Sequence, residues 1–174
     1  SASATEELAT SVPDNGGVYF VPALTGLGAP YWDQYARGAI IGITRGTKAA
    51  HITRAALEGI CYQVYDVLKA MENDIHTKPK EIRVDGGAIA NNFLMQFQSD
   101  VLDCKVERPQ CIETTSLGAA YLAGLATGYW KNKEDVLQNW QVDRTFEPAM
   151  DVSKRKEMLA GWAKAVEKTR GWAK

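Results

Sequence analysis

The sequence predicts an α/β fold, and two observations carry this prediction. Two strand–helix units follow one another directly in residues 81–127, and this alternation is typical of a parallel sheet whose ligands bind at the carboxyl ends of the strands. Apolar residues recur every three or four positions over residues 50–71, which is the period of a helix. With 174 residues, the chain has the length of one domain and can bury a core of its own.

The first part of the chain is predicted to hold a connector, two short strands and a long helix. Residues 1–17 are mostly small and polar and end in a dense turn signal, so we expect a connector there. Residues 18–21 and 39–43 are short apolar runs, and each predicts a strand. Between them, residues 23–35 have the composition of an ordered loop. The helix at 50–71 is expected to bury one stripe, made of Ile52, Ala56, Ile60, Val64, Val67 and Met71.

The second part is predicted to alternate strands and helices. Strands are expected at 82–84 and 105–109, the second of them stopped by a proline, and helices at 93–102 and 116–127. Small residues in the helix at 116–127 allow very close packing: Gly118, Ala119, Ala120, Ala123 and Gly124.

A last helix is expected over residues 152–172. Its apolar face is formed by Met158, Trp162, Val166 and Thr169. We therefore divide the chain into a connector (1–17), a domain (18–150) and a C-terminal helix (151–174) that packs on the same domain. The C-terminal segment carries seven lysines and arginines against three acids, which indicates a solvated face or, alternatively, a docking surface for a partner.

Composition and charge exclude several function classes. The net charge of −1 gives no basic excess for nucleic acid, and no apolar run reaches the length of a membrane span. The first residues lack the pattern of a signal peptide, so we expect a cytoplasmic protein. The three cysteines and two histidines show no metal-ligand spacing. We therefore expect reduced structural thiols and no metal site in this chain.

The most informative segment is the corner at Asp85-Gly86-Gly87-Ala88. It follows a short strand and precedes a predicted helix, and glycine lets a ligand lie against bare backbone. Free N–H groups at the start of a helix favour an anion, so the corner is a plausible nucleotide site. The alternative is a simple turn between strand and helix. Asn91 is likewise either a helix N-cap, a nucleotide contact, or both.

Other phosphate-binding or catalytic motifs are absent from the sequence. Gly26-Leu27-Gly28 is followed by a proline, which is incompatible with the usual dinucleotide fingerprint, and there is no P-loop or nucleophile elbow. Four carboxylates lie beside apolar or glycine-rich segments: Asp33, Glu58, Asp66 and Asp85. Each could be a general base, but a cap, a surface charge or a paired polar group explains each one more simply. We assign no catalytic residue.

Three segments carry a resemblance to a known family. They are Gly26-Leu27-Gly28-Ala29-Pro30-Tyr31-Trp32-Asp33, the constrained positions between Gly38 and Glu58, and residues 83–100, which hold the Asp-Gly-Gly corner. Together they resemble the glycerol kinases within the FGGY family of carbohydrate kinases. The resemblance implies an actin-like, hexokinase-like ATPase fold of the ribonuclease H type. Residues 18–150 would be its C-terminal nucleotide-binding domain, with a partial sheet flanked by helices.

The resemblance also implies an activity and a site. Such enzymes move the γ-phosphoryl group of Mg·ATP to glycerol, and the residues expected to contact or shape the nucleotide site are Gly86, Gly87, Ala88 and Asn91. The glycerol contacts, the catalytic aspartate, the phosphate loops and the Mg²⁺ ligands are expected in a preceding part of the protein. This chain would then be inactive alone, and its open sheet edge would lead to self-association or to a compensating rearrangement there. The full enzyme is expected to be a homo-oligomer.

Two alternatives remain open at this point. The sequence motifs of the chain resemble those of glycerol kinases, but the residues expected to determine substrate specificity lie outside this chain. A second hypothesis is therefore the same domain of another FGGY sugar kinase, for xylulose or gluconate. A third is a non-catalytic nucleotide-binding module that keeps only the fold.

Overall fold

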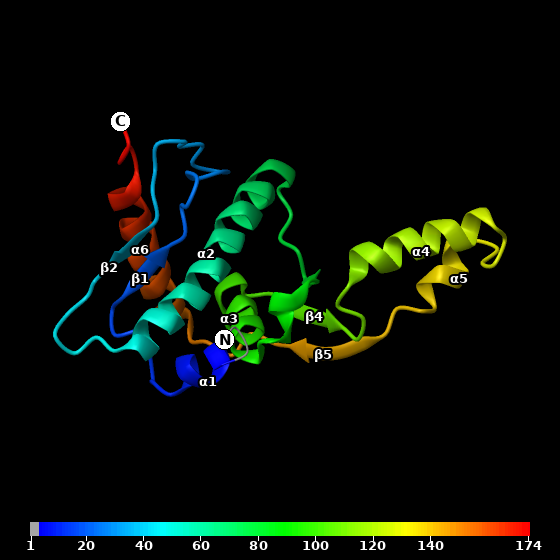
Figure 1. The fold of residues 1–174 in the computed structure, drawn as a ribbon, viewed down its shortest axis with the longest axis horizontal. Coiled ribbons are helices and arrows are strands. Elements are labelled where there is room, and N and C mark those ends of the chain that lie inside the picture. Colours follow the sequence, from blue (N-terminus) through cyan, green and yellow to red (C-terminus); the bar gives the residue numbers. More distant parts are fainter. Residues whose placement is uncertain (1–3) are drawn as a thin grey trace.

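A computed structural model describes residues 4–174 and confirms the α/β class (Figure 1). The helices are α1 (Thr5–Thr10), α2 (Ala49–Ile75), α3 (Asn92–Leu102), α4 (Thr114–Ala126), α5 (Lys133–Leu137) and α6 (Val152–Thr169), with a 3-10 turn, η2, at Gly87–Ala90. The strands are β1 (Tyr19–Val21), β2 (Ala39–Ile41), β3 (Glu81–Arg83), β4 (Lys105–Pro109) and β5 (Val142–Phe146).

The strands form two separate small sheets. Strands β1 and β2 pair antiparallel, with Tyr19 opposite Ile41. In the other sheet β3 and β4 are parallel, which confirms the two strand–helix units, and β5 pairs antiparallel with β4. Strand β5 was not predicted. Its side chains before Phe146 are exposed, so the strand lacks the alternation of apolar and polar residues that would indicate it.

Helix α2 runs between the two sheets and carries the centre of the core (Figure 1). The ring of Tyr62 stacks on Trp162 of α6 at 5.1 Å and meets Phe97 of α3 edge-on at 5.4 Å. Three helices are thus joined by one aromatic cluster, which is the kind of contact that adds to simple area burial.

The predicted buried stripe of α2 is wrong, although the helix itself is confirmed. Ile60 and Met71, two members of that stripe, are exposed. The buried face is centred instead on Ala55, Gly59 and Tyr62. Gly59 decides this orientation, because a Cβ there would lie 2.3 Å from the carbonyl oxygen of Phe20 in β1. The helix therefore turns its smallest residue to the strand and leaves Ile60, Val67 and Met71 of the predicted stripe exposed.

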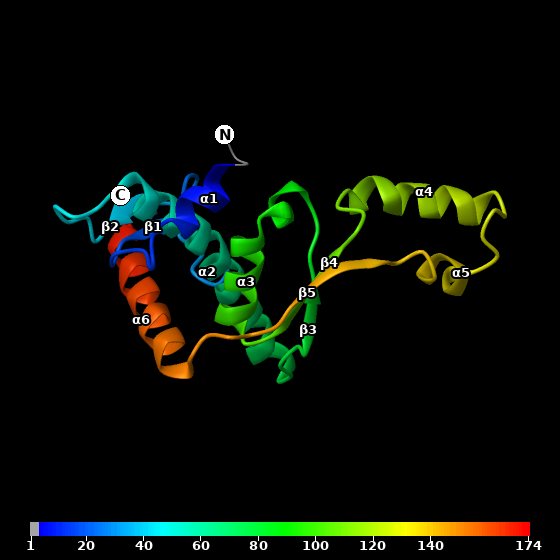
Figure 2. The ribbon, with the colours of Figure 1, turned by 90° about the horizontal axis from the view of Figure 1, so that it is seen from below.

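Helices α4 and α5 form an arm that extends away from the rest of the structure in both ribbon views (Figure 1, Figure 2). None of the residues of α4 is buried. The predicted close packing is realised at Gly124, where a Cβ would meet the ring of Trp130 at 2.2 Å. The small residues of α4 otherwise make no buried contact within the described part of the chain.

Helix α6 matches its predicted face and packs on the β1 side of the molecule. Trp162, Val166 and Thr169 are buried, and Tyr19 of β1 donates a hydrogen bond to the carbonyl oxygen of Met158 at 3.2 Å. The helix ends at Thr169, three residues before the predicted end. The division of the chain at residues 17 and 150 stays a prediction.

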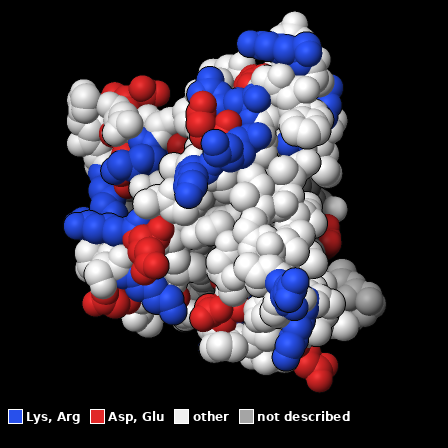
Figure 3. All heavy atoms as spheres, turned by 90° about the vertical axis from the view of Figure 1, so that its left-hand side faces the viewer, with Lys and Arg blue, Asp and Glu red and all other residues white. Residues whose placement is uncertain are grey.

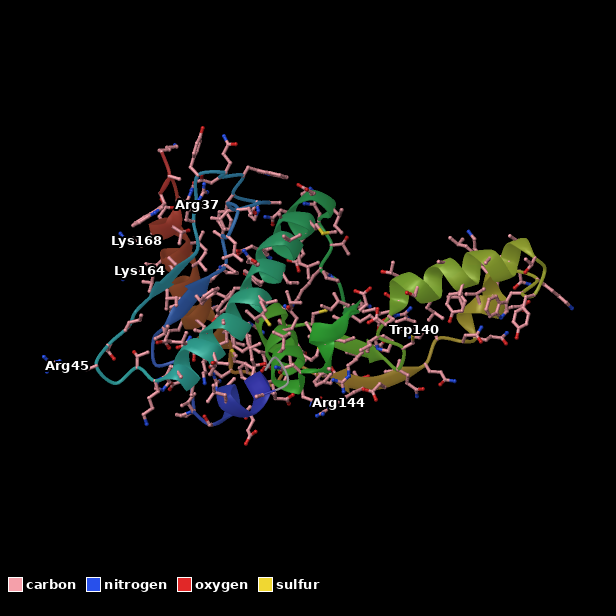
Figure 4. The ribbon with its side chains drawn as sticks, in the orientation of Figure 1. Arg37, Arg45, Trp140, Arg144, Lys164 and Lys168 are labelled. Carbon is pink, nitrogen blue, oxygen red and sulfur yellow. The ribbon has the colours of Figure 1, made fainter. Side chains whose placement is uncertain are left out.

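The charged residues on this side of the molecule do not form a field of one sign. Figure 3 shows Lys, Arg, Asp and Glu interspersed around an uncharged area. Lys164 and Lys168 point away from the rest of the structure (Figure 4), whereas Arg155 forms an ion pair with Asp103 at 2.7 Å. Within residues 4–174, no helix combines the length and the apolar character needed to cross a membrane.

Candidate functional site

The Asp85–Gly87 corner lies at the carboxyl end of β3, as predicted. Gly86 has a φ of +86°, a conformation that favours glycine, and its N–H donates to the carbonyl oxygen of Ile112 at 2.9 Å. That bond ties the corner to the segment that follows β4. A Cβ added at Gly86 or at Gly87 would meet no atom of the described structure within 4 Å. The corner therefore borders open space, as a ligand site requires.

The helix after the corner begins within one residue of its predicted start at residue 93. The 3-10 turn η2 intervenes, and α3 begins at Asn92 with Asn91 as its N-cap. The Oδ1 atom of Asn91 accepts the N–H of Leu94 at 2.9 Å, which confirms the cap interpretation. The Nδ2 atom of Asn91 donates to the hydroxyl of Thr5 in α1 at 3.4 Å.

The amino terminus of α3 is occupied by a side chain of the chain itself. The N–H of Asn92 donates to the Oε2 atom of Glu6 at 3.0 Å, and the N–H of Leu94 is taken by Asn91. Two of the N–H groups at the start of α3 are therefore bonded within the chain and are not free for an anion. The corner is better suited to the uncharged base and ribose of a nucleotide than to its phosphates.

A hollow of about 640 Å³ lies beside the corner. Its lining comes from the corner, from α3, from α2 and from α1, and consists of Gly87, Ala88, Ala90, Asn91, Leu94, Leu57, Ile60, Thr5 and Glu6. Three of the four predicted site residues thus line one hollow, and Gly86 shapes the turn behind it. Ile60, which is 44% exposed, belongs to the wall of this hollow rather than to the core. Few polar groups among apolar walls is the usual make-up of a small-molecule site.

The contribution of α1 was missed in the sequence. Residues 1–17 were expected to be a connector, and a helix of six residues offers too few positions for a periodic signal. The Thr5 and Glu6 side chains reach the site only because the fold brings α1 against α2 and α3.

The four candidate carboxylates all have structural partners. Asp66 accepts from the Tyr31 hydroxyl at 2.8 Å and from Nε1 of Trp162 at 2.7 Å. Burial raises the pKa of Asp66, and these two bonds work against that rise. Asp85 accepts a hydrogen bond from the Thr114 hydroxyl.

Asp33 and Glu58 are also paired. Asp33 accepts the N–H of Gly171 at 2.9 Å, and this bond is the main cause that lowers the pKa of Asp33. Glu58 is fully buried and accepts from Arg54 at 2.9 Å and from Asn15 at 2.8 Å. Burial raises the pKa of Glu58, and the two partners oppose the rise. The paired-group interpretation therefore describes both carboxylates.

No group of three or more His, Cys, Asp or Glu side chains in residues 4–174 is arranged to hold a metal ion. The three cysteines form no disulfide: Cys61 and Cys104 are buried and Cys111 is exposed. Burial raises the pKa of the Cys61 thiol, which suits an inert structural residue.

Comparison with known proteins identifies the family to which the chain belongs. Residues 1–127 match the model of the C-terminal domain of the FGGY family of carbohydrate kinases, and the chain belongs to that family. It is 71% identical over 173 residues to the glycerol kinase of Parabacteroides distasonis, covering 99% of this chain and 35% of that protein.

Solved structures agree with the family assignment. Plasmodium falciparum glycerol kinase with ADP superposes with a TM-score of 0.85 and 39% identity, over 96% of this chain and 33% of that one. Ligand-bound xylulose kinase from Lactobacillus acidophilus gives a TM-score of 0.78 and 25% identity, over 95% and 34%. These kinases have the actin-like, hexokinase-like fold that the resemblance implied. The chain spans about a third of the length of the relatives it matches.

Proposed function

We propose that this chain is the nucleotide-binding C-terminal part of a glycerol kinase, an enzyme that transfers the γ-phosphoryl group of ATP to glycerol and forms glycerol 3-phosphate. The observation that carries the proposal is the hollow at the glycine corner, in a chain that is 71% identical to a glycerol kinase. The structure of the Plasmodium falciparum relative was solved with ADP, which supports a nucleotide as the ligand class.

The adenosine end of ATP or ADP is the part that we place in this hollow. Leu57, Ile60 and Leu94 offer apolar surface to a base, and Gly87 and Ala88 allow it to lie close to the main chain. Asn91 provides an amide at the edge of the hollow. The triphosphate would extend away from the Glu6 carboxylate, because like charges repel.

The chemical step needs groups that we place in the remainder of the enzyme. Phosphoryl transfer depends on positioning and on stabilising charge on the transferred group, with Mg²⁺ and a residue that accepts the proton of the substrate hydroxyl. The carboxylates of this chain near the hollow are committed to structural bonds. We therefore propose that Mg²⁺, glycerol and the catalytic base are bound by the other part, and that the isolated chain has no kinase activity.

A chimera tests this proposal directly. In the Parabacteroides distasonis glycerol kinase, this chain would replace the 173 matching residues. The expected result is glycerol-dependent ATP turnover by the chimera and none by the isolated chain. A folded chimera that does not bind ADP would contradict the proposal. A folded chimera that binds ADP but does not turn over ATP would favour the non-catalytic nucleotide-binding module.

The alternative substrate class needs a different experiment, because the chimera borrows its substrate contacts. The protein completed with its own amino-terminal part would be assayed with glycerol, xylulose and gluconate. Turnover of glycerol alone supports the proposal, whereas preference for a sugar or sugar acid would assign the chain to another FGGY kinase. We also propose that the complete enzyme is a cytoplasmic homo-oligomer.

A further inference from the structure

Helix α1 forms one wall of the proposed nucleotide hollow and contacts the residues that set its geometry. The Thr5 hydroxyl accepts a hydrogen bond from Nδ2 of Asn91, and the Glu6 carboxylate accepts the N–H of Asn92. Both acceptors lie in the first turn of α1. Any displacement of this helix therefore moves the two groups that orient Asn91 and the start of α3.

The helix cannot hold this position by itself. It has six residues, and no side chain caps its amino terminus. Helices of this length are unstable unless tertiary contacts fix them. Ala9 is the one buried residue of α1, so little apolar burial anchors the helix. Its place therefore depends on its packing against α2 and α3 and on the segment of residues 11–17 that joins it to β1.

That segment is fastened to α2 by a buried polar cluster. Nδ2 of Asn15 donates to Oε2 of Glu58 at 2.8 Å, and Nε of Arg54 donates to Oε1 of Glu58 at 2.9 Å. Arg54 also donates through Nη1 to the carbonyl oxygen of Val12 at 2.8 Å. Glu58 is 0% exposed and Asn15 is 7% exposed, so water does not compete for these bonds.

Asn15 uses both ends of its amide. While Nδ2 bonds Glu58, its Oδ1 atom accepts the N–H of Gly17 at 2.9 Å and closes the turn that leads into β1. On α2, Glu58 stands directly beside Leu57 and near Ile60, which line the hollow from the other side. The Asn15–Glu58 bond therefore joins the segment behind one wall of the hollow to the helix that forms another.

We propose that Asn15 and Glu58 are positioning residues for the nucleotide site: their hydrogen bond fixes residues 11–17 and so holds α1 against Asn91. This inference rests on the proposed function, because the hollow matters to the reaction only if a nucleotide binds there. Neither side chain lines the hollow, so both act through α1 and α2.

The decisive variant is Asn15→Asp in the chimeric kinase. The change is isosteric and keeps the acceptor for Gly17, but it replaces the Nδ2 donor with an oxygen that faces the Glu58 carboxylate. The KM for ATP is expected to rise about tenfold, as for the loss of one hydrogen bond to a charged group. The kcat and the KM for glycerol are expected to stay unchanged.

A second substitution supplies the rescue that a general loss of stability would not show. Glu58→Gln combined with Asn15→Asp exchanges the donor and the acceptor of the same pair, and it is expected to restore most of the affinity for ATP. The matched control is Asn139→Asp, the same chemical change at an exposed residue of the arm that bonds only main-chain oxygens. If Asn15→Asp is insoluble, Asn15→Ala replaces it, because Arg54 still pairs with Glu58 in that variant.

Hydrogen exchange separates this inference from the proposed function. In the unliganded isolated chain, Asn15→Asp is expected to speed exchange of the α1 amides while those of α3 stay protected. Unchanged α1 protection, or an unchanged KM for ATP in a folded variant, would overturn the positioning role. The third outcome is that Asn15→Asp speeds exchange of the α1 amides, but the unmutated chimera binds no nucleotide. That result would refute the proposed function and would still support the role of the Asn15–Glu58 hydrogen bond in holding α1.

Discussion

At the scale of single residues, the two glycines of the corner have different reasons to be glycine. Gly86 has a positive φ, which costs any other residue conformational energy. The φ of Gly87 is not positive, and the residue borders the hollow. The first glycine therefore serves the fold, and we propose that the second serves the nucleotide expected in the hollow.

Alanine scanning of the pair tests this division. We expect Gly86→Ala to lower the free energy of unfolding by about 1–2 kcal/mol, the cost of a left-handed conformation with a Cβ. Gly87→Ala should leave stability within about 0.5 kcal/mol, the range of a substitution without contacts. Urea unfolding measures both. Equal losses at the two positions would contradict the assignment.

A larger residue at the second glycine tests the ligand side. Gly87→Val places a branched side chain in the hollow, and in the chimeric kinase we expect the KM for ATP to rise at least about tenfold, because a base can no longer approach the main chain. The KM for glycerol serves as the internal control. Unchanged affinity for ATP in the folded variant would move the nucleotide away from Gly87.

The half-buried carboxylate of Asp66 gives a pH dependence. Its pKa is raised above the ordinary value of 3.8, chiefly by burial, so the folded state binds a proton more tightly than the unfolded state. The stability from this group is complete below 3.8 and is lost as the pH rises through the folded pKa. We therefore expect Asp66→Asn to cost more stability at pH near 4 than at neutral pH. Denaturant unfolding of both proteins across this range measures the difference, and a cost that grows toward neutral pH would contradict it.

At the scale of elements, the spacing of apolar residues predicted that α2 is a helix but did not predict which face of the helix is buried. The spacing in α2 identified a helix correctly, but several faces of that helix carry apolar residues, and the contact of Gly59 with β1 selects which face is buried. The close approach of β1 to a single glycine cannot be predicted from the spacing of apolar residues in α2. Likewise α1 is too short and β5 too polar to give a pattern, so both depend on their tertiary neighbours.

The same reasoning explains how much of the site could be foreseen. Gly87, Ala88 and Asn91 are adjacent in sequence and carry a recognisable motif, so their meeting at one hollow was predictable. Thr5 and Glu6 lie about eighty residues earlier and enter the hollow only through the packing of α1 on α2 and α3. Long-range contacts of this kind have no local signal.

The arm formed by α4 and α5 gives the prediction that belongs to elements. Because no residue of α4 is buried, its amides should exchange with solvent faster than those of α3, which buries Leu94, Phe97 and Val101. Hydrogen exchange of the isolated chain measures this by peptide, with α3 as the internal reference. Equal protection of the two helices would show that the arm packs on a surface in solution.

At the scale of the whole molecule, the chain has a packed core but leaves sheet edges unpaired and apolar side chains exposed. Among the described strands, β2 pairs only with β1 and β3 only with β4, so each sheet keeps an open edge. Exposed aliphatic side chains accompany this, with Ile40 on β2 and Leu122 on α4 exposed by 40% and 71%. Open edges and apolar surface are what a chain shows when it is built to pack against more protein.

Self-association of the isolated chain should follow from these unpaired edges and exposed side chains, and two variants distinguish its routes. If edges pair, Ile40→Lys places a charge on an edge strand and lowers association, while Leu122→Lys has no effect. If the exposed face of α4 associates instead, Leu122→Lys lowers association and Ile40→Lys has no effect. Sedimentation velocity over a range of concentrations measures both against the parent chain. A monomer at all concentrations would contradict the prediction. Joining the chain to the remainder of a glycerol kinase should abolish the self-association that occurs through an open sheet edge. We expect strands from that remainder to pair with the edge.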